Sequence, residues 1–198
     1  MIRIGLTGGI ATGKSYVVRR IREAGVPVVD ADVLARDAVA PGSPGLAAVV
    51  ARFGQDMLTP AGDLDRARLA DIVFRDQDAR RDLEAIVHPI VRRQTAEFFA
   101  ALPPDTALAV ADIPLLFETH RERAFDKVVV VACPPDTQLS RLMRRDNLSR
   151  EAAERRIAAQ LPIEEKARRA DHVIRTDGTH EETDVQVASL LASLRSSP

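Results

Sequence analysis

The stretch that decides the fold is Gly8-Gly9-Ile10-Ala11-Thr12-Gly13-Lys14-Ser15. It fits the pattern Gly-x-x-x-x-Gly-Lys-Ser, follows a short apolar run and opens a segment with helical spacing. Glycines let a backbone approach phosphates without side-chain collision, and the N-terminus of the following helix offers unpaired amides and a positive dipole end. The alternative is a glycine-rich turn in an ordinary strand-helix unit, but the flanking pattern favours binding of a nucleoside triphosphate.

Each residue of this loop has an expected contact with the nucleotide. Lys14 is predicted to reach the β and γ phosphates, and Ser15 to offer its hydroxyl to the magnesium ion that accompanies ATP. The backbone amides are expected to hold the phosphate chain. The predicted ATP-binding residues are Ala11, Thr12, Gly13, Lys14, Ser15 and Tyr16.

Composition excludes several other classes of protein. The 198 residues, 45% of them hydrophobic, are enough for one substantial core with small inserted subdomains. With 28 basic and 29 acidic residues the net charge is -1, so no general attraction to nucleic acid or to a membrane is expected. The only cysteine, Cys133, excludes a disulfide framework. Neither a signal peptide nor a membrane span is predicted, and a cytoplasmic location is expected.

Apolar runs of strand length recur along the chain, mostly separated by segments with helical spacing. Nearly continuous apolar strands are typical of a parallel sheet that is covered by helices on both faces. We therefore predict an α/β fold of the P-loop nucleotide kinase type, with ligands at the carboxyl ends of the strands. The five expected strands are Ile2 to Leu6, Val26 to Val29, Ala107 to Ala111, Lys127 to Ala132 and His172 to Ile174.

Two helical regions interrupt this alternation. Residues 46–102 lack any strand pattern and predict a helical substrate-binding insertion, within which Pro89 is expected to start a new helix or kink one. An arginine-dense segment follows the fourth strand and predicts a helical lid, although solvated ion pairs explain many of its charges. The predicted single domain, 1–198, has a core of about 1–30, 104–140 and 171–198, a helical subdomain of about 31–103 and a lid of about 141–170.

Acidic residues close two of the predicted strands. Asp112 follows the third strand beside the phosphate loop, where it could hold magnesium directly or through water, or could cap a turn or helix. Asp30 and Asp32 follow the second strand, and Asp30 is the better N-cap for the next helix. The four histidines are scattered, which argues against a metal site built by protein ligands alone.

The loop occurs in both nucleotide-dependent switches and small-molecule kinases. Guanine-binding switches carry Asp-x-x-Gly and Asn-Lys-x-Asp, but no glycine of this chain has an aspartate three residues before it. Asn147, the only asparagine, is followed by Leu148. A non-catalytic switch is therefore the least favoured reading, and a kinase is favoured.

Several further motifs carry a resemblance to a known family. They are Gly-Leu-Thr-Gly-Gly-Ile near the start, Asp30-Ala31-Asp32, Pro41-Gly42, Val87-His88-Pro89, Asp112-Ile-Pro-Leu-Leu-Phe-Glu118 and the arginine-rich lid. Together they resemble the dephospho-coenzyme A kinases over nearly the whole chain. The resemblance implies transfer of the ATP γ-phosphate to the ribose 3'-hydroxyl of dephospho-coenzyme A, the last step of coenzyme A biosynthesis. The alternative is a P-loop kinase for another small nucleotide-like acceptor.

The resemblance also implies roles for single residues. Asp32 matches the family's acidic position and is our candidate base for the acceptor hydroxyl, with Asp112 as the runner-up. Arg141 matches a position in the helix after the fourth strand, where it would neutralise charge on the transferred group, or would be only a solvated helix arginine. His88 and Arg92 would bind the acceptor in the coenzyme A-binding subdomain, or would serve as a cap and a salt bridge.

The chain departs from the family pattern in three places. Ala11 stands where glycine is usual, and a positive φ there would strain the alanine by about 1 kcal/mol. Tyr16 replaces a small hydroxyl residue, and Thr176 replaces an asparagine near the last strand. The implied partners are ATP and dephospho-coenzyme A, with no nucleic acid and no membrane. The sequence leaves the oligomeric state open and is compatible with a monomer.

Overall fold

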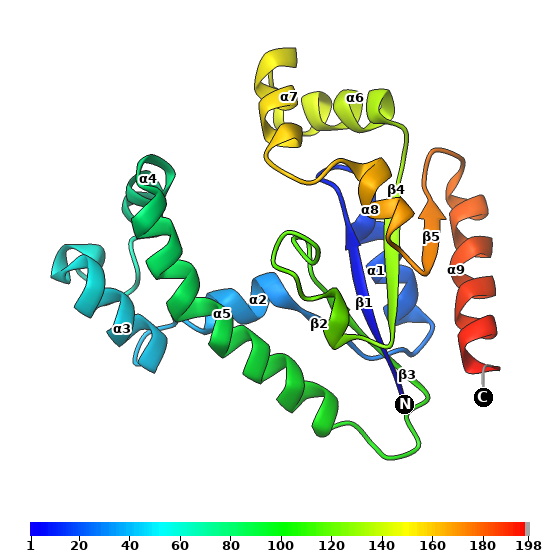
Figure 1. Ribbon diagram of the computed structural model, residues 1–198, viewed down its shortest axis with the longest axis horizontal. Helices are drawn as coiled ribbons and strands as arrows, with labels where there is room; N and C mark the ends of the chain where they lie inside the picture. The colour runs from blue at the N-terminus through cyan, green and yellow to red at the C-terminus, as the bar shows by residue number, and fades with distance from the viewer. Residues whose placement is uncertain (197–198) are drawn as a thin grey trace. The chain divides into compact units, whose positions relative to one another are not determined.

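The computed structural model describes residues 1–196 and contains a five-stranded sheet (Figure 1). The strand order is β2-β3-β1-β4-β5, and β1 pairs in parallel with β3 and β4, as β4 does with β5. The predicted α/β fold with a parallel sheet is therefore confirmed. The strands are β1 (Ile2–Gly8), β2 (Val28–Asp30), β3 (Leu108–Asp112), β4 (Lys127–Ala132) and β5 (His172–Arg175).

Helices cover both faces of this sheet. Successive side chains of a strand point to opposite faces, and the buried strands carry apolar residues on both. On one face, Ile4, Leu6 and Val129 pack in a core with α1 (Lys14–Glu23) and α9 (His180–Arg195). On the other face, a Cβ at Gly5 would meet Phe125 and Leu116. Figure 1 shows α1 behind the strands and α8 (Ile163–Arg168) in front of them. The remaining helical elements here are η2 (Glu122–Ala124), α6 (Pro135–Asp146) and α7 (Arg150–Ala158).

Two helix starts follow directly from local sequence. Thr179 and Glu182 form a capping box at the start of α9, an arrangement that a threonine followed three residues later by a glutamate favours. Asp30 caps α2 (Ala31–Asp37) by accepting from the amides of Asp32 and Val33, at 2.8 and 3.3 Å. The expected N-cap role of Asp30 is confirmed.

The chain divides into two compact units. One comprises Met1–Val29 together with the chain from Leu102 onward, and the other comprises Asp30–Ala101. The second unit is helical, with a break between its helices at residues 58–65. Its elements are α2, α3 (Pro44–Phe53), η1 (Gln55–Met57), α4 (Arg66–Arg75) and α5 (Gln77–Ala100).

The second unit has a hydrophobic core of its own. Val49 and Met57 lie at its centre, and the apolar stripe of α5, including Leu83 and Val87, packs against it. Pro89 does not start a new helix but lies inside α5, which runs unbroken for 24 residues. None of the helices within residues 1–196 is both long and apolar enough to cross a membrane.

Candidate nucleotide-binding site

The phosphate loop runs from the end of β1 into the start of α1. Gly13 is the N-cap residue of α1, with φ of 86° and no side-chain cap. Within the described chain, the amides of Ala11, Gly13, Lys14 and Ser15 donate no hydrogen bond to another protein group. The amide of Tyr16, in contrast, donates to the Gly13 carbonyl at 3.0 Å. The loop therefore presents a set of open amides at a helix N-terminus, which is a geometry that binds anions.

Ala11 adopts the left-handed backbone conformation, with φ of 59°. This conformation costs a residue with a Cβ about 1 kcal/mol, so Ala11 is strained where glycine is usual in the family that the sequence resembles. The turn is closed by the fully buried Thr12, whose hydroxyl donates to the Gly9 carbonyl at 2.9 Å. The loop thus keeps its shape although Ala11 lacks the freedom of glycine.

Lys14 and Asp112 form an ion pair in this structure. Asp112 ends β3 opposite Leu6 of β1, and it is only 4% exposed. The Lys14 side chain is 16% exposed, so both charges lie largely out of water. Such a pair is strongly attractive but costs desolvation, and an incoming phosphate can replace the carboxylate as the partner of the ammonium group.

Arg141 is tied to the loop through Thr176, which follows β5. Its guanidinium donates to the Thr176 hydroxyl at 3.1 Å and to the Thr176 carbonyl at 2.6 Å. The Thr176 hydroxyl in turn donates to the Thr12 carbonyl at 2.6 Å. The residue that replaces asparagine therefore has a specific role, which is to join Arg141 to the backbone of the phosphate loop.

Two glutamines hold Ile10, at the start of the loop. Gln160 accepts from the Ile10 amide, and Gln138 donates to the Ile10 carbonyl, both at 2.8 Å. Sequence reasoning missed both residues. Gln138 lies on the same helical face as Leu142, four residues on, which would have marked it as a buried polar side chain.

The side chain of Tyr16 contacts α9. Its hydroxyl donates to Asp184 at 2.9 Å, and its ring stacks on His180 with centroids 4.3 Å apart. Burial raises the pKa of the Tyr16 phenol, and the hydrogen bond to Asp184 raises it further. Tyr16 is therefore a neutral anchor between α1 and α9.

The other predicted site residues belong to the second unit. Asp32 is exposed in the first turn of α2. His88 is half-buried and Arg92 is exposed, and the two lie four residues apart on α5. The structure thus brings Lys14, Asp112 and Arg141 together around the loop, and it places Asp32, His88 and Arg92 in the helical unit.

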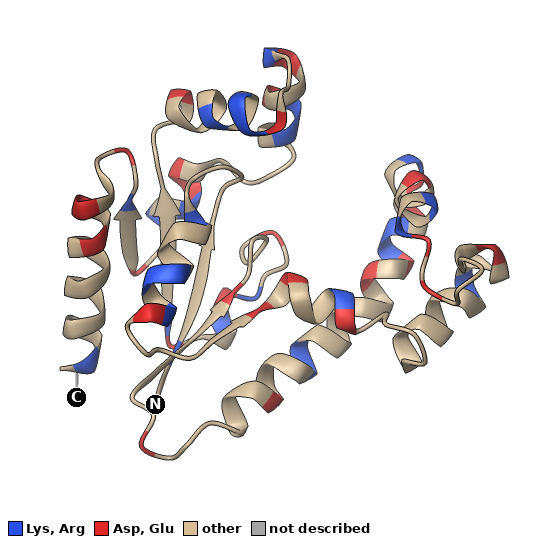
Figure 2. Cartoon of the chain, turned by 180° about the vertical axis from the view of Figure 1, so that it is seen from behind, with Lys and Arg blue, Asp and Glu red and all other residues tan. Residues whose placement is uncertain are grey.

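Many charges in residues 141–170 pair with each other. Arg150 bonds Glu154 at 2.8 Å, and Arg156 bonds Asp146 at 2.7 Å. Figure 2 shows basic residues along α6 and a mixture of basic and acidic residues on α7. These pairs match the solvated ion pairs that the sequence suggests for many of the arginines.

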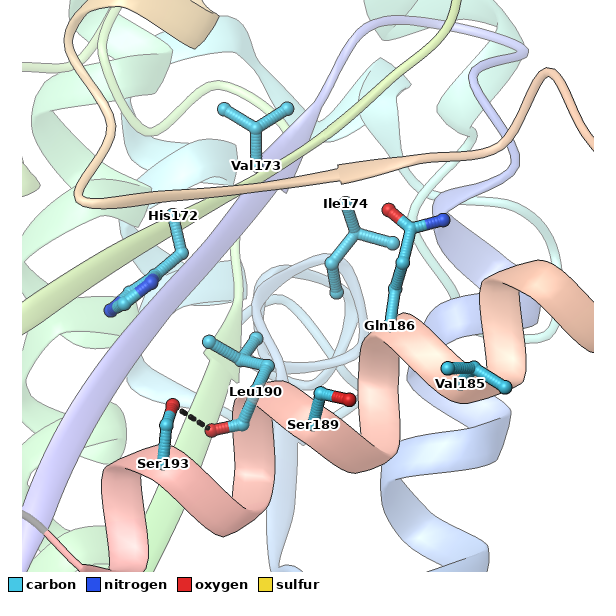
Figure 3. A pocket seen from close by; sticks show the side chains of 8 residues that line it. All are labelled: His172, Val173, Ile174, Val185, Gln186, Ser189, Leu190 and Ser193. Carbon is cyan, nitrogen blue, oxygen red and sulfur yellow. Dashed lines mark hydrogen bonds between the residues drawn. The ribbon is translucent and has the colours of Figure 1, made fainter.

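Two further features of the described residues do not point to a second centre. Residues 1–196 hold no group of three His, Cys, Asp or Glu side chains arranged for a metal ion. A surface pocket of about 440 Å³ runs along β5 and α9, between residues such as His172, Gln186 and Ser193 (Figure 3). No residue of the phosphate loop lines it, so the loop remains the candidate site.

A parallel sheet with an open-amide loop after β1 and a lysine on the first turn of α1 defines a P-loop nucleoside triphosphate-binding protein. The dephospho-CoA kinase family model matches residues 2–182. The chain therefore belongs to the dephospho-CoA kinase family.

Individual relatives agree with this assignment. The dephospho-CoA kinase of Anaeromyxobacter dehalogenans is 52% identical over 193 residues, which are 97% of this chain and 92% of the relative. A solved structure from Thermus thermophilus is 38% identical with a TM-score of 0.83, covering 98% of this chain and 97% of its own. The dephospho-CoA kinase from Campylobacter jejuni is 28% identical with a TM-score of 0.75, covering 98% of this chain and 96% of its own.

The link through Thr176 can be tested with a matched pair of variants. Thr176→Val removes the hydroxyl, and we expect it to lower the free energy of unfolding by about 1–3 kcal/mol, since buried polar groups lose their partner. ATP affinity should fall as well, because the Thr12 carbonyl is released. Thr176→Ser keeps the hydroxyl and should change both quantities much less. The free energy of unfolding is measured by urea unfolding, and the ATP affinity by titration calorimetry. Equal results for the two variants would show that the hydroxyl does not hold the loop.

Proposed function

We propose that this protein transfers the γ-phosphoryl group of ATP to the ribose 3'-hydroxyl of dephospho-coenzyme A, giving coenzyme A and ADP. The observation that carries the proposal is the family match over residues 2–182, which includes a loop with open amides and a lysine. Two of the proteins named above, from Anaeromyxobacter dehalogenans and Campylobacter jejuni, are described as dephospho-CoA kinases. We further propose that the reaction takes place in the cytoplasm, where ATP is abundant, which suits a chain whose single cysteine is a free thiol.

The donor half of the site consists of the phosphate loop. The open amides of Gly13, Lys14 and Ser15 would hold the phosphate chain at the positive end of the α1 dipole. The Lys14 ammonium would leave Asp112 and bridge the β and γ phosphates. Arg141, at the edge of the loop, would stabilise negative charge on the transferred group, which is where phosphoryl transfer needs cations.

Magnesium is the metal that this donor set fits. Ser15 and Asp112 supply a hydroxyl and a carboxylate, which are the hard oxygen ligands that Mg²⁺ prefers. Few protein ligands are needed, because Mg²⁺ keeps several waters and takes others from phosphates. When bound, the ion neutralises phosphate charge. We propose that Ser15 binds it directly and that Asp112 does so directly or through a water.

Asp32 is the proposed acceptor of the proton that leaves the ribose hydroxyl. Asp30 carries the capping role at the start of α2, and this supports Asp32 as the residue of the pair that acts in chemistry. We propose that residues 31–103 bind the coenzyme A part of the substrate, with His88 and Arg92 on α5 as contacts. Residues 141–170 would act as the lid that excludes water.

The proposed phosphoryl acceptor, dephospho-coenzyme A, can be tested against other acceptor substrates. The purified protein with Mg-ATP is offered dephospho-coenzyme A, AMP, shikimate or adenylylsulfate, and ADP formation and the phosphorylated product are measured. We expect rapid turnover with dephospho-coenzyme A alone and a product phosphorylated at the ribose 3' position. Phosphorylation of one of the other acceptors, with none of dephospho-coenzyme A, would overturn the proposed function.

The role of Asp32 predicts a specific kinetic defect. Asp32→Asn should lower the single-turnover rate by about 10²- to 10⁴-fold, the usual contribution of a general base, while Mg-ATP still binds. Asp37→Asn is the matched control, because Asp37 is also exposed on α2. A single-turnover rate equal to that of the unmodified protein would remove Asp32 from the mechanism.

The proposed role of Asp112 predicts a change in metal requirement. Asp112→Asn should raise the Mg²⁺ concentration for half-maximal activity by about 10- to 100-fold, the range seen when a metal site loses a supporting carboxylate. Asp105→Asn serves as the control, since Asp105 is exposed and lies before the start of β3. If the Mg²⁺ dependence is unchanged in Asp112→Asn, the carboxylate does not serve the metal.

A further inference from the structure

Lys166 is buried beneath the phosphate loop. It lies on α8, three residues after Ile163, and its side chain is 0% exposed. A lysine is almost never fully buried unless it is paired. The contacts of its ammonium group explain how this charge is buried.

The Lys166 ammonium contacts both chain segments that form the donor site. It donates to the carbonyl of Gly8 at 3.3 Å, where β1 ends and the loop begins. It also donates to the carbonyl of Pro114 at 3.2 Å, two residues after Asp112. One cation therefore joins the segment that carries Lys14 to the segment that carries Asp112.

Glu118 supplies the compensating charge. Its Oε1 lies 2.8 Å from the Lys166 ammonium and accepts from the Leu161 amide at 3.0 Å. Its second oxygen, Oε2, is buried and has no hydrogen-bond partner within the described residues. Glu118 therefore balances the charge of Lys166 and holds the chain before α8.

A buried ion pair is weak evidence for stability, because apolar side chains of similar volume often stabilise a core equally well. Three charge-assisted contacts around one ammonium, by contrast, fix the distances between the groups that they join. The two segments are also joined by the Ile113 amide, which donates to the Leu6 carbonyl at 2.8 Å, and by the Thr7 hydroxyl, which donates to the Pro114 carbonyl at 3.0 Å. Lys166 adds the link at Gly8, where the loop itself begins. We therefore expect Lys166 to matter more for the position of the phosphate loop than for the stability of the fold.

We propose that Lys166 is a positioning residue for phosphoryl transfer, which holds the phosphate loop and the segment after Asp112 at the separation that the donor site requires. This inference rests on the proposed function. In this proposal α8, which lies within the predicted lid, supports the phosphate loop through the contact of Lys166 with the Gly8 carbonyl. Gln160, which binds the Ile10 amide, extends the same brace.

The test separates position from stability by means of a double variant. Lys166→Met alone leaves the Glu118 carboxylate buried without its partner, and its thermal midpoint should fall by about 10 °C. Lys166→Met combined with Glu118→Met removes both charges and should recover most of that loss. The activity of the double variant should nevertheless stay about 10²-fold below normal in kcat, because small displacements of reacting groups are costly.

Two further readouts complete the experiment. The affinity for Mg-ATP, measured by titration without acceptor, should fall in the double variant, whereas KM for dephospho-coenzyme A should change by less than about threefold. Lys127→Met is the control, since this lysine lies at the start of β4 and its side chain is 42% exposed.

Each outcome decides the question. Recovery of stability together with normal kcat and Mg-ATP affinity would overturn the positioning role, and so would a double variant that fails to fold, since the pair would then serve the core. A protein that binds Mg-ATP but never phosphorylates dephospho-coenzyme A, in its unmodified form, would overturn the proposed function. The affinity for Mg-ATP would in that case still test the brace.

Discussion

The donor site depends on one constraint, which is that a phosphate loop must leave its own amides unpaired. A loop that satisfied the amides of Gly13, Lys14 and Ser15 internally could not offer them to phosphates. The shape of the loop must therefore be fixed by groups other than these three amides. Here the Thr12 hydroxyl, Thr176 and the two glutamines at Ile10 do this work, through contacts with carbonyls and with the one amide at the edge of the loop.

Charge is arranged around the loop in two buried ion pairs. Lys14 pairs with Asp112, and Lys166 pairs with Glu118. We propose that the first pair is exchangeable, because phosphate oxygens could replace the carboxylate. The second is enclosed, with a lysine that is 0% exposed and bound to two carbonyls. In this proposal the Lys14–Asp112 ion pair opens when phosphate binds, whereas the Lys166–Glu118 ion pair stays in place.

Much of the fold could be predicted because the signals are local. Apolar runs mark the strands, and the glycine pattern marks the phosphate loop. Asp30 and the Thr179 capping box lie where helices start. The supporting residues could not be predicted in the same way, because Gln160 and Lys166 reach the loop across about 150 residues of chain. Lys166 lies in the charged segment for which the sequence favours solvated ion pairs, although its spacing from Ile163 places it on the buried face of α8. Asp32, His88 and Arg92 remain predictions about the helical unit.

The most direct test of this account is a crystal structure of the protein with Mg²⁺ and a non-hydrolysable ATP analogue. We predict phosphate oxygens on the amides of Gly13, Lys14 and Ser15, with the Lys14 ammonium moved from Asp112 to the β and γ phosphates. Magnesium should lie on the Ser15 hydroxyl and on Asp112, directly or through a water. An analogue bound elsewhere, with Lys14 still paired to Asp112 and the loop amides unoccupied, would contradict the account.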